Sequence, residues 1–341
     1  MNEDSPHVLI VRLGAIGDGV FASPLIGAVK RTWPDAKVSW LAEPALASML
    51  SVNPDIEEVV VWPRQRWQSL LRSFRLLALF REVLDFRREL KRRRFDQVFD
   101  VQGLLKSAIL ARLTGAPQRT GLDSGEPTGW LMTRVLPKSR NVARIGSEYL
   151  GFAEAVGLDV GDFEMQVATR PGDRAQADRE RLRGRYAVLC PFTTRPQKHW
   201  FVEQWRDVAI GLADRGLRVL LLGGPGDVEM VDAYIEGTAV ESRAGLTTLT
   251  ETSALIERAE ILIGVDTGLT HMGIANATPT VALFGSTCPY TDTTRENAVV
   301  LYRKLECSPC RRNPTCEGRF DCMREITPAA VLAQVDRLLA P

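Results

Sequence analysis

Histidine and long apolar runs are scarce in this sequence. Its 341 residues include only three histidines, His7, His199 and His271, which lie far apart along the chain. A metal hydrolase built on a histidine cluster is therefore not expected. No apolar run approaches the roughly 20 residues that a membrane-spanning helix needs, and residues 1–7 carry charges where a signal peptide would have an apolar core. These absences predict a cytoplasmic protein.

An excess of charge of one sign is also missing. The chain has 43 Lys and Arg against 42 Asp and Glu, a formal net charge of +1, and 45% of its residues are hydrophobic. Such a composition excludes a disordered chain and a small disulfide scaffold. At about 100 to 200 residues per domain, the length predicts two globular domains.

Short apolar runs alternate with amphipathic segments of helical length from end to end. The runs expected as buried strands are residues 8–11, 38–41, 59–62, 98–101, 186–190, 218–222, 261–265 and 280–284. Strands that alternate with helices form parallel sheets with right-handed crossovers, so the pattern predicts an α/β fold. We expect an N-terminal domain over 1–175, a C-terminal domain over 176–327 and a final helix over 328–341.

The first loop after a predicted strand contains Gly14, Gly17, Asp18 and Gly19. Its glycine spacing, G-x-x-G-x-G, differs from the dinucleotide-binding pattern G-x-G-x-x-G. A carboxylate in the first turn of a helix would repel a pyrophosphate, which disfavours a nicotinamide oxidoreductase. Asp18 can instead act as the general base that takes a proton from an alcohol, or it can simply cap the helix.

The loops of the second half carry the groups that bind anions. The candidates are Thr193, Thr194, Lys198, Asp266, Thr267, Gly268 and His271, with Asp227 and Glu229 as competing partners for ribose hydroxyls. Singly, Lys198 can be a solvated cation, Asp266 a helix cap and His271 a helix histidine with satisfied hydrogen bonds. Together, on successive strand ends, these residues predict a nucleotide-diphosphate site.

Residues 64–94 form an arginine-rich segment with eleven Arg and Lys against three acids, interleaved with aromatic and aliphatic residues. Such a segment can bind an anionic membrane surface or glycolipid, or can be an ordinary solvated amphipathic surface. Nucleic acid would suit the charge as well, but no recognised nucleic-acid-binding motif is present, so we do not expect a nucleic-acid partner.

Four ordered motifs resemble the ADP-heptose:lipopolysaccharide heptosyltransferases of glycosyltransferase family 9, and within that family the pattern is most similar to heptosyltransferase I. They are the loop 14–18, the segment 100–108 with Asp100, Gln102 and Lys106, the run 193–200, and the strand end 265–271. The resemblance extends from Val8 to about Phe284, most of the chain.

This resemblance implies a GT-B fold, in which two Rossmann-like domains face each other across a cleft and the last helix returns to the first domain. It also implies an inverting transfer of L-glycero-D-manno-heptose from ADP-heptose to a Kdo sugar of the lipopolysaccharide inner core on Kdo-lipid A, without a catalytic cofactor. The enzyme would work as a peripheral protein on the cytoplasmic face of the inner membrane.

The resemblance further implies a role for each candidate residue. Asp18 corresponds to the catalytic base, and Lys198 would bind the diphosphate and stabilise the leaving ADP. The donor-binding set would be Thr193, Thr194, Lys198, Glu229, Asp266, Thr267, Gly268 and His271, and the acceptor-binding set Gly17, Arg64, Arg66, Gln102 and Lys106. Another family 9 enzyme, with a different nucleotide sugar or a second-heptose acceptor, is the alternative.

A cysteine cluster near the C-terminus has no counterpart in the best-matching pattern. Cys307, Cys310, Cys316 and Cys322 lie within sixteen residues. In a reducing compartment such thiols can hold a structural zinc or iron ion, because the C-x2-C step offers two ligands to one metal. A disulfide or redox pair and simple reduced thiols are the other possibilities.

Overall fold

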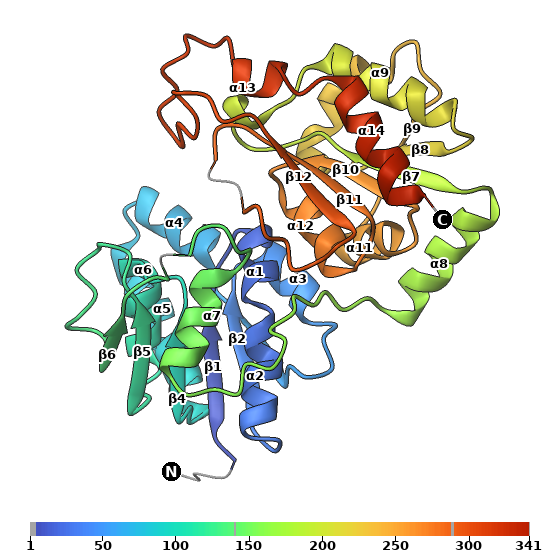
Figure 1. The fold of residues 1–341 in the computed structure, drawn as a ribbon. Coiled ribbons are helices and arrows are strands. Elements are labelled where there is room, and N and C mark those ends of the chain that lie inside the picture. The colour runs from blue at the N-terminus through green and yellow to red at the C-terminus, as the bar shows by residue number, and fades with distance from the viewer. Residues whose placement is uncertain (1–4, 140, 288–289, 341) are drawn as a thin grey trace. The chain divides into compact units, whose positions relative to one another are not determined.

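The computed structural model describes residues 5–139, 141–287 and 290–340. The chain divides into two α/β units (Figure 1). The first unit is Met1–Asn141 with Gly146–Ala168, and the second is Val142–Ile145 with Thr169–Pro341. The predicted boundary at residue 175 therefore lies a few residues inside the second unit, in the helix that opens with Pro171.

The first unit is a parallel sheet with strand order β3-β2-β1-β4-β5-β6. Its strands are β1 (His7–Val11), β2 (Lys37–Ala42), β3 (Glu58–Val61), β4 (Gln97–Asp100), β5 (Gln118–Leu122) and β6 (Arg134–Leu136). Its helices are α1 (Ile16–Ala22), α2 (Pro24–Thr32), α3 (Pro44–Leu50), α4 (Arg64–Arg72), α5 (Leu76–Arg92), α6 (Leu105–Leu113) and α7 (Ser147–Ala155).

The second unit repeats the design with strand order β12-β11-β10-β7-β8-β9. Its strands are β7 (Tyr186–Cys190), β8 (Arg218–Leu221), β9 (Glu241–Ser242), β10 (Ile261–Val265), β11 (Thr280–Phe284) and β12 (Ala298–Tyr302). Its helices are α8 (Pro171–Leu182), α9 (Val202–Ala213), α10 (Val231–Ile235), α11 (Leu249–Glu257), α12 (Gly268–Ala275), α13 (Asp321–Arg324) and α14 (Pro328–Leu339), with the 3-10 turns η1 (Pro196–Lys198) and η2 (Pro225–Met230).

Strand order reverses once in each sheet, and this reversal positions the functional loops. In the first unit the neighbours β1 and β4 pair in parallel although five helices and two strands separate them in sequence. In the second unit β7 and β10 are the corresponding pair. Ligands of open parallel sheets bind beyond the carboxyl ends of the strands at such reversals. The loops after β1, β4, β7 and β10 are therefore the first places to seek a site.

A buried tryptophan anchors the loop after β7. Trp200 is 2% exposed and packs edge-on against Trp205, with 5.1 Å between the ring centroids. Its indole N–H donates to the carbonyl oxygens of Met323 and Ile326 at 3.1 and 3.0 Å. Since a buried indole N–H that lacks a partner costs stability, these bonds hold the loop against the C-terminal segment.

Helix α14 packs within the second unit. It contacts α9, β11 and β12, and its residues Val331 and Val335 are fully buried in that unit's core. The structure shows that this helix packs on α9. Its expected return to the first domain stays a prediction. The family-based GT-B fold itself, two Rossmann-like units, is confirmed.

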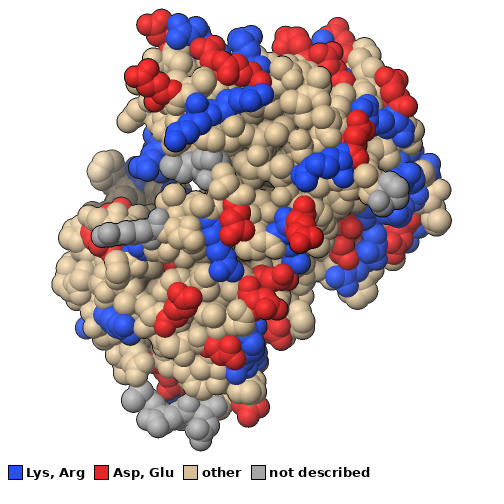
Figure 2. Space-filling view, viewed as in Figure 1, with Lys and Arg blue, Asp and Glu red and all other residues tan. Residues whose placement is uncertain are grey.

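The mixture of charges on the surface agrees with the near-zero net charge of the sequence. On the face that Figure 2 shows, Lys and Arg are intermixed with Asp and Glu. Over the described ranges, 5–139, 141–287 and 290–340, no helix has both the length and the hydropathy needed to cross a bilayer.

Candidate active site

The loop after β1 presents the carboxylate of Asp18. Asp18 lies in the first turn of α1, and its side chain is 39% exposed. The guanidinium of Arg12, at the end of β1 and only 11% exposed, forms an ion pair with it. The carboxylate also accepts the backbone N–H of Ala15 at 3.3 Å. Asp18 is therefore not itself the N-cap, as one interpretation predicted, but the third residue of α1, which bonds back to the N-cap residue Ala15. Its carboxylate remains open to solvent, as the base interpretation requires.

The loop after β4 is joined to the loop after β1 by a hydrogen bond. The side-chain oxygen of Gln102 accepts the backbone N–H of Leu13 at 2.8 Å, and Gln102 is buried. Asp100 holds the turn that presents Gln102, because its carboxylate accepts the N–H groups of Gln102 and Gly103 at 3.2 and 3.1 Å. Burial raises the pKa of Asp100 to about 6, although those bonds and the hydroxyl of Ser107 partly offset the rise.

The loops after β7 and β10 meet in a partly buried charge cluster. The ammonium of Lys198, in η1, lies 2.5 Å from one carboxylate oxygen of Asp266, which directly follows β10. The other oxygen lies 3.2 Å from Nε2 of His271, one turn into α12. Burial would raise the pKa of Asp266, but the contacts with His271 and Lys198 outweigh it and lower the pKa below its ordinary value. Asp266 is therefore an anion that fixes the position of the Lys198 cation.

Tyr290 completes the cluster from the far side of His271. Its hydroxyl lies 2.7 Å from Nδ1 of His271, and burial raises the pKa of Tyr290 well above its ordinary value. The phenol and Nδ1 share one hydrogen bond, and Nε2 faces the carboxylate of Asp266. Both ring nitrogens of His271 thus bond within the protein, so this residue reaches a ligand through Asp266.

Backbone N–H groups and hydroxyls surround the same corner. Thr267 precedes α12 with an extended backbone, and its side chain makes no capping hydrogen bond. The N–H groups of the first turn, beginning at Gly268, are consequently not used by that side chain and can meet an anion. Thr193 donates its hydroxyl to the carbonyl of Asp266 at 3.4 Å, while Thr194 is exposed.

The two candidate ribose acids differ in what they already bind. Asp227 accepts the N–H of Gly224 at 2.7 Å, so it stabilises the glycine turn before η2. Glu229 is exposed on η2, and no hydrogen bond or ion pair of its side chain occurs among the residues that the structure describes. Glu229 is therefore the more available of the two for a ligand.

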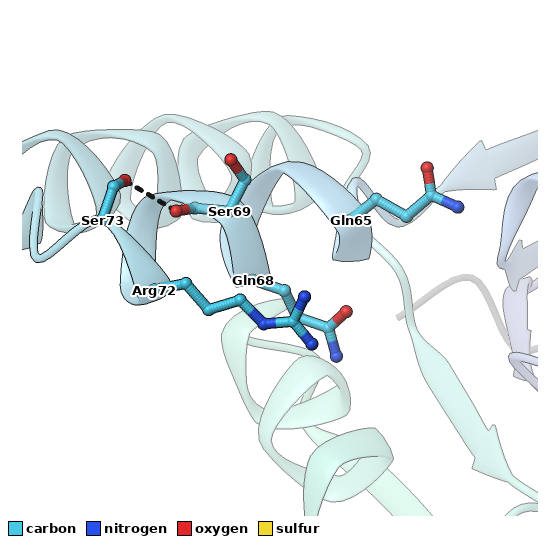
Figure 3. Close-up of a pocket in the computed structure, with 5 residues that line it drawn as sticks. All are labelled: Gln65, Gln68, Ser69, Arg72 and Ser73. Carbon is cyan, nitrogen blue, oxygen red and sulfur yellow. Dashed lines mark hydrogen bonds between the residues drawn. The ribbon is translucent and has the colours of Figure 1, made fainter.

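The predicted acceptor residues on the first unit are dispersed. Arg64 lies 3.0 Å from Glu43, and Arg66 lies 2.6 Å from Glu82, so both cations have acidic partners. Lys106 is partly exposed at the start of α6, and Gly17 is buried in α1. Beside Arg64 and Arg66, one side of α4 lines an open hollow of about 420 Å³ (Figure 3). Its lining is Gln65, Gln68, Ser69, Arg72 and Ser73.

The geometry does not support the metal hypothesis for the cysteine cluster. Cys307, Cys310, Cys316 and Cys322 are free thiols, and Cys316 and Cys322 are buried. In the described part of the chain, no three His, Cys, Asp or Glu side chains are grouped so that they could hold an ion. Reduced thiols are the interpretation that the structure favours.

Two partners in the site carried no predicted role. Arg12 directly follows the buried strand β1 and pairs with Asp18. A charged residue at the end of an apolar run was the feature of the sequence that could have indicated its role. Tyr290 lies 19 residues beyond His271, and no spacing rule joins them.

Sequence comparison adds the decisive observation. The profile of glycosyltransferase family 9 (heptosyltransferase) matches residues 83–320, which is most of the chain. The chain belongs to glycosyltransferase family 9. It is accordingly an enzyme that transfers a glycosyl group, and the sequence-based recognition of the family is confirmed.

Relatives of this family 9 glycosyltransferase match over nearly their whole length. It is 30% identical to lipopolysaccharide heptosyltransferase 1 of Pseudomonas aeruginosa, over 98% of this chain and 99% of that protein. The structure of Escherichia coli heptosyltransferase WaaC with ADP-2-deoxy-2-fluoro heptose matches with a TM-score of 0.73 and 26% identity, over 97% of this chain and 99% of that one. A family 9 glycosyl transferase from Veillonella parvula matches with a TM-score of 0.82 and 22% identity, over 99% and 98%; this last likeness concerns the fold alone.

Proposed function

We propose that this enzyme transfers L-glycero-D-manno-heptose from ADP-heptose to a Kdo sugar of the lipopolysaccharide inner core, with inversion at the anomeric carbon. The observation that carries the proposal is the charge cluster of Lys198, Asp266 and His271 at the sheet reversal of the second unit, in a chain 30% identical to a lipopolysaccharide heptosyltransferase. The solvent-open carboxylate of Asp18 supplies the complementary base.

The donor diphosphate would bind at the carboxyl ends of β7 and β10. An ammonium has three N–H donors, so Lys198 can keep its bond to Asp266 and offer others to a phosphate oxygen. The N–H groups at the start of α12 and the hydroxyls of Thr193 and Thr194 would complete the phosphate contacts. Glu229 would accept hydrogen bonds from the ribose hydroxyls. No metal is needed for these contacts, because the protein supplies the positive charge.

In the reaction, Asp18 would accept the proton of the attacking Kdo hydroxyl while that oxygen bonds to the anomeric carbon of heptose. The bond from this carbon to the phosphate oxygen of ADP breaks on the opposite side, which inverts the configuration. Negative charge then grows on the departing ADP, where Lys198 stabilises it most strongly in the transition state. Arg12 would hold the Asp18 carboxylate in the orientation that a base requires.

The acceptor would lie against the first unit. Arg64, Arg66 and Lys106 are suited to the carboxylates of Kdo, and Gln102 and Gly17 would shape the loop that meets its hydroxyl. The same proposal has the enzyme work as a peripheral protein on the anionic cytoplasmic face of the inner membrane, where Kdo-lipid A is presented. The arginine-rich segment supports this because only part of its charge is paired within the protein.

The proposal is tested by measuring ADP release from ADP-heptose in the presence of Kdo-lipid A. We expect turnover by the wild type and a loss of about 10³-fold or more in kcat for Asp18→Asn, because the amide cannot take the proton. Asp85→Asn, which removes an exposed carboxylate paired with Arg88 on α5, is the matched control and should retain full turnover.

Two results would contradict the proposal. Undiminished turnover in Asp18→Asn would remove the base role. Turnover with a different sugar nucleotide, together with none with ADP-heptose, would overturn the donor assignment.

A further inference from the structure

The corner that joins α4 to α5, residues 71–80, exposes large apolar side chains, and two of them, Leu77 and Phe80, share one face of α5 because they lie three residues apart. Phe74 is 86% exposed, Leu77 is 78% exposed and Phe80 is 61% exposed. Leu71 and Leu76 on the same corner are more than half exposed. Leaving this much apolar surface in water is unfavourable, and a contiguous exposed patch marks an interaction site more often than scattered single residues do.

Backbone geometry turns Phe74 outward. Its φ is +55°, in the left-handed region that residues other than glycine and asparagine seldom adopt. Helix α4 ends at Arg72, and α5 begins at Leu76 (Figure 1). The chain thus reverses direction at Phe74 and exposes its ring at the apex, where packing within the protein does not account for it.

The charge around the apex is uniformly positive. Residues 70–81 include Arg72, Arg75 and Arg81 and no Asp or Glu. The acids of α5 form ion pairs with other residues, Glu82 with Arg66 and Asp85 with Arg88. Within the ranges that the structure describes, no ion pair involves Arg72, Arg75 or Arg81. Apolar side chains ringed by unpaired guanidinium groups match the boundary between acyl chains and anionic headgroups.

We propose that the α4–α5 corner inserts Phe74, Leu77 and Phe80 into the acyl region of an anionic lipid leaflet, with its arginines at the headgroups. A second copy of this chain is a less favourable partner for this corner than a lipid leaflet. Joining two corners would bring six arginines together without a carboxylate between them. The corner would bring the polar hollow of α4, lined by Gln65 and Arg72, to the sugars nearest the membrane. This inference deepens the membrane association that the proposed function includes, and the position of the hollow rests on that proposed function.

Vesicle flotation tests the insertion. The full-length wild type is mixed with vesicles of phosphatidylglycerol and phosphatidylcholine, or of phosphatidylcholine alone. We expect strong partitioning into the anionic vesicles, and a decrease of at least about tenfold for the triple variant Phe74→Ser, Leu77→Ser, Phe80→Ser. The matched control is Val142→Ser, Leu182→Ser, Leu246→Ser, which removes residues 70%, 86% and 75% exposed on the second unit and should partition as the wild type does.

A depth-sensitive signal separates insertion from adsorption by charge alone. Phe74→Trp and Leu182→Trp are compared in vesicles whose acyl chains carry bromine. Quenching beyond that of the wild type is expected only for Phe74→Trp. Equal quenching in both variants, or flotation of the triple serine variant at the level of the wild type, would overturn the proposal. A concentration-dependent dimer in ultracentrifugation that the triple variant abolishes would assign the corner to self-association and overturn it as well.

Activity on a water-soluble acceptor keeps this proposal distinct from the proposed function. With a lipid-free Kdo acceptor, the triple serine variant should turn over as the wild type does. Absence of turnover in both proteins would count against the proposed function and leave the flotation result standing.

Discussion

The proposed function gives three residues of the first unit a part in presenting the base. Asp18 carries the carboxylate, Arg12 pairs with it, and Gln102 holds the preceding backbone through the N–H of Leu13. A base must be held within hydrogen-bonding reach of the proton that it takes, so the supporting bond matters for rate although Gln102 is buried. Gln102 was predicted to contact the acceptor, and the structure gives its side-chain oxygen a partner within the protein.

Replacing Gln102 by leucine tests this support. The variant Gln102→Leu leaves the N–H of Leu13 without its acceptor, which should cost about 1–3 kcal/mol in the free energy of unfolding. We expect kcat to fall by roughly tenfold or more while the KM for ADP-heptose changes little, because the donor contacts lie elsewhere. The exposed residue Gln176 provides the control: Gln176→Leu should leave both constants unchanged. A higher donor KM with normal kcat in Gln102→Leu would contradict the support role.

Contacts between site residues could be predicted where the residues are close in sequence or follow the ends of neighbouring strands. The predicted residues Lys198, Asp266 and His271 do meet, because β7 and β10 are neighbours whose carboxyl ends carry them. The hydrogen bond between Tyr290 and His271 could not be predicted from the sequence, because it depends on the path of the chain after β11.

At the scale of elements, α12 must pack closely against β10 for its first turn to reach the site. Gly264 makes this possible, since a Cβ there would lie 2.1 Å from the hydroxyl oxygen of Thr270 and 3.0 Å from Cβ of Cys190. That hydroxyl donates to the carbonyl of Val265 at 2.6 Å, which ties the helix to the strand end.

The variant Gly264→Ala should displace this turn. We expect a loss of about 1–3 kcal/mol in the free energy of unfolding from overpacking, together with weaker ADP binding. Thermal denaturation and ADP titration are the measurements. In Gly172→Ala the new methyl group meets open space in α8, so stability should be kept or slightly raised. Equal stability of the two variants would show that the close packing is not required.

The turn after β4 makes stability depend on pH. The pKa of Asp100 is about 6 in the fold against an ordinary value of 3.8, because burial disfavours its charge. Between these values the folded protein binds more protons than the unfolded chain, so the free energy of unfolding falls as pH rises from about 4 to 6, by up to about 1.4 kcal/mol per pH unit. Below pH 4 both states are protonated and this contribution is constant.

Denaturant unfolding of the wild type and of Asp100→Asn between pH 4 and 8 checks this. The difference in stability between the two proteins should change across pH 4–6 and level off above it, because the amide does not titrate. Parallel curves over the whole range would contradict the raised pKa.

The strands that could be predicted from the sequence are the buried ones, because their apolar runs are distinct. Each of the eight strands expected from apolar runs is found within a residue or so of its predicted bounds. The strands that were missed, β5, β6, β9 and β12, are short, carry polar residues or lie toward the sheet edges, as Gln118–Leu122 and Glu241–Ser242 illustrate. Only the sheet as a whole supplies the partners that make such segments strands.

For the whole molecule, chain length and alternation of elements were sufficient to predict two α/β units. Each unit has its own buried core, one around β1 and β4 and the other around β7 and β10. The division falls at residues 168–169, a few residues before the predicted boundary. The charged segment around that boundary forms α8, whose arginines pair with Glu257 and Glu260, and single-sequence patterning does not reveal such long-range pairs.

We propose that the two units have separate roles: the second binds the nucleotide and the first supplies the base. Calorimetric titration with ADP tests it most directly, with Asp18→Ala and Lys198→Ala compared under the same conditions. We expect Asp18→Ala to keep the Kd of the wild type for ADP within about threefold. Lys198→Ala should raise this Kd by about tenfold or more, because a charge-assisted hydrogen bond to phosphate is lost. Weakened ADP binding in Asp18→Ala together with wild-type affinity in Lys198→Ala would contradict it.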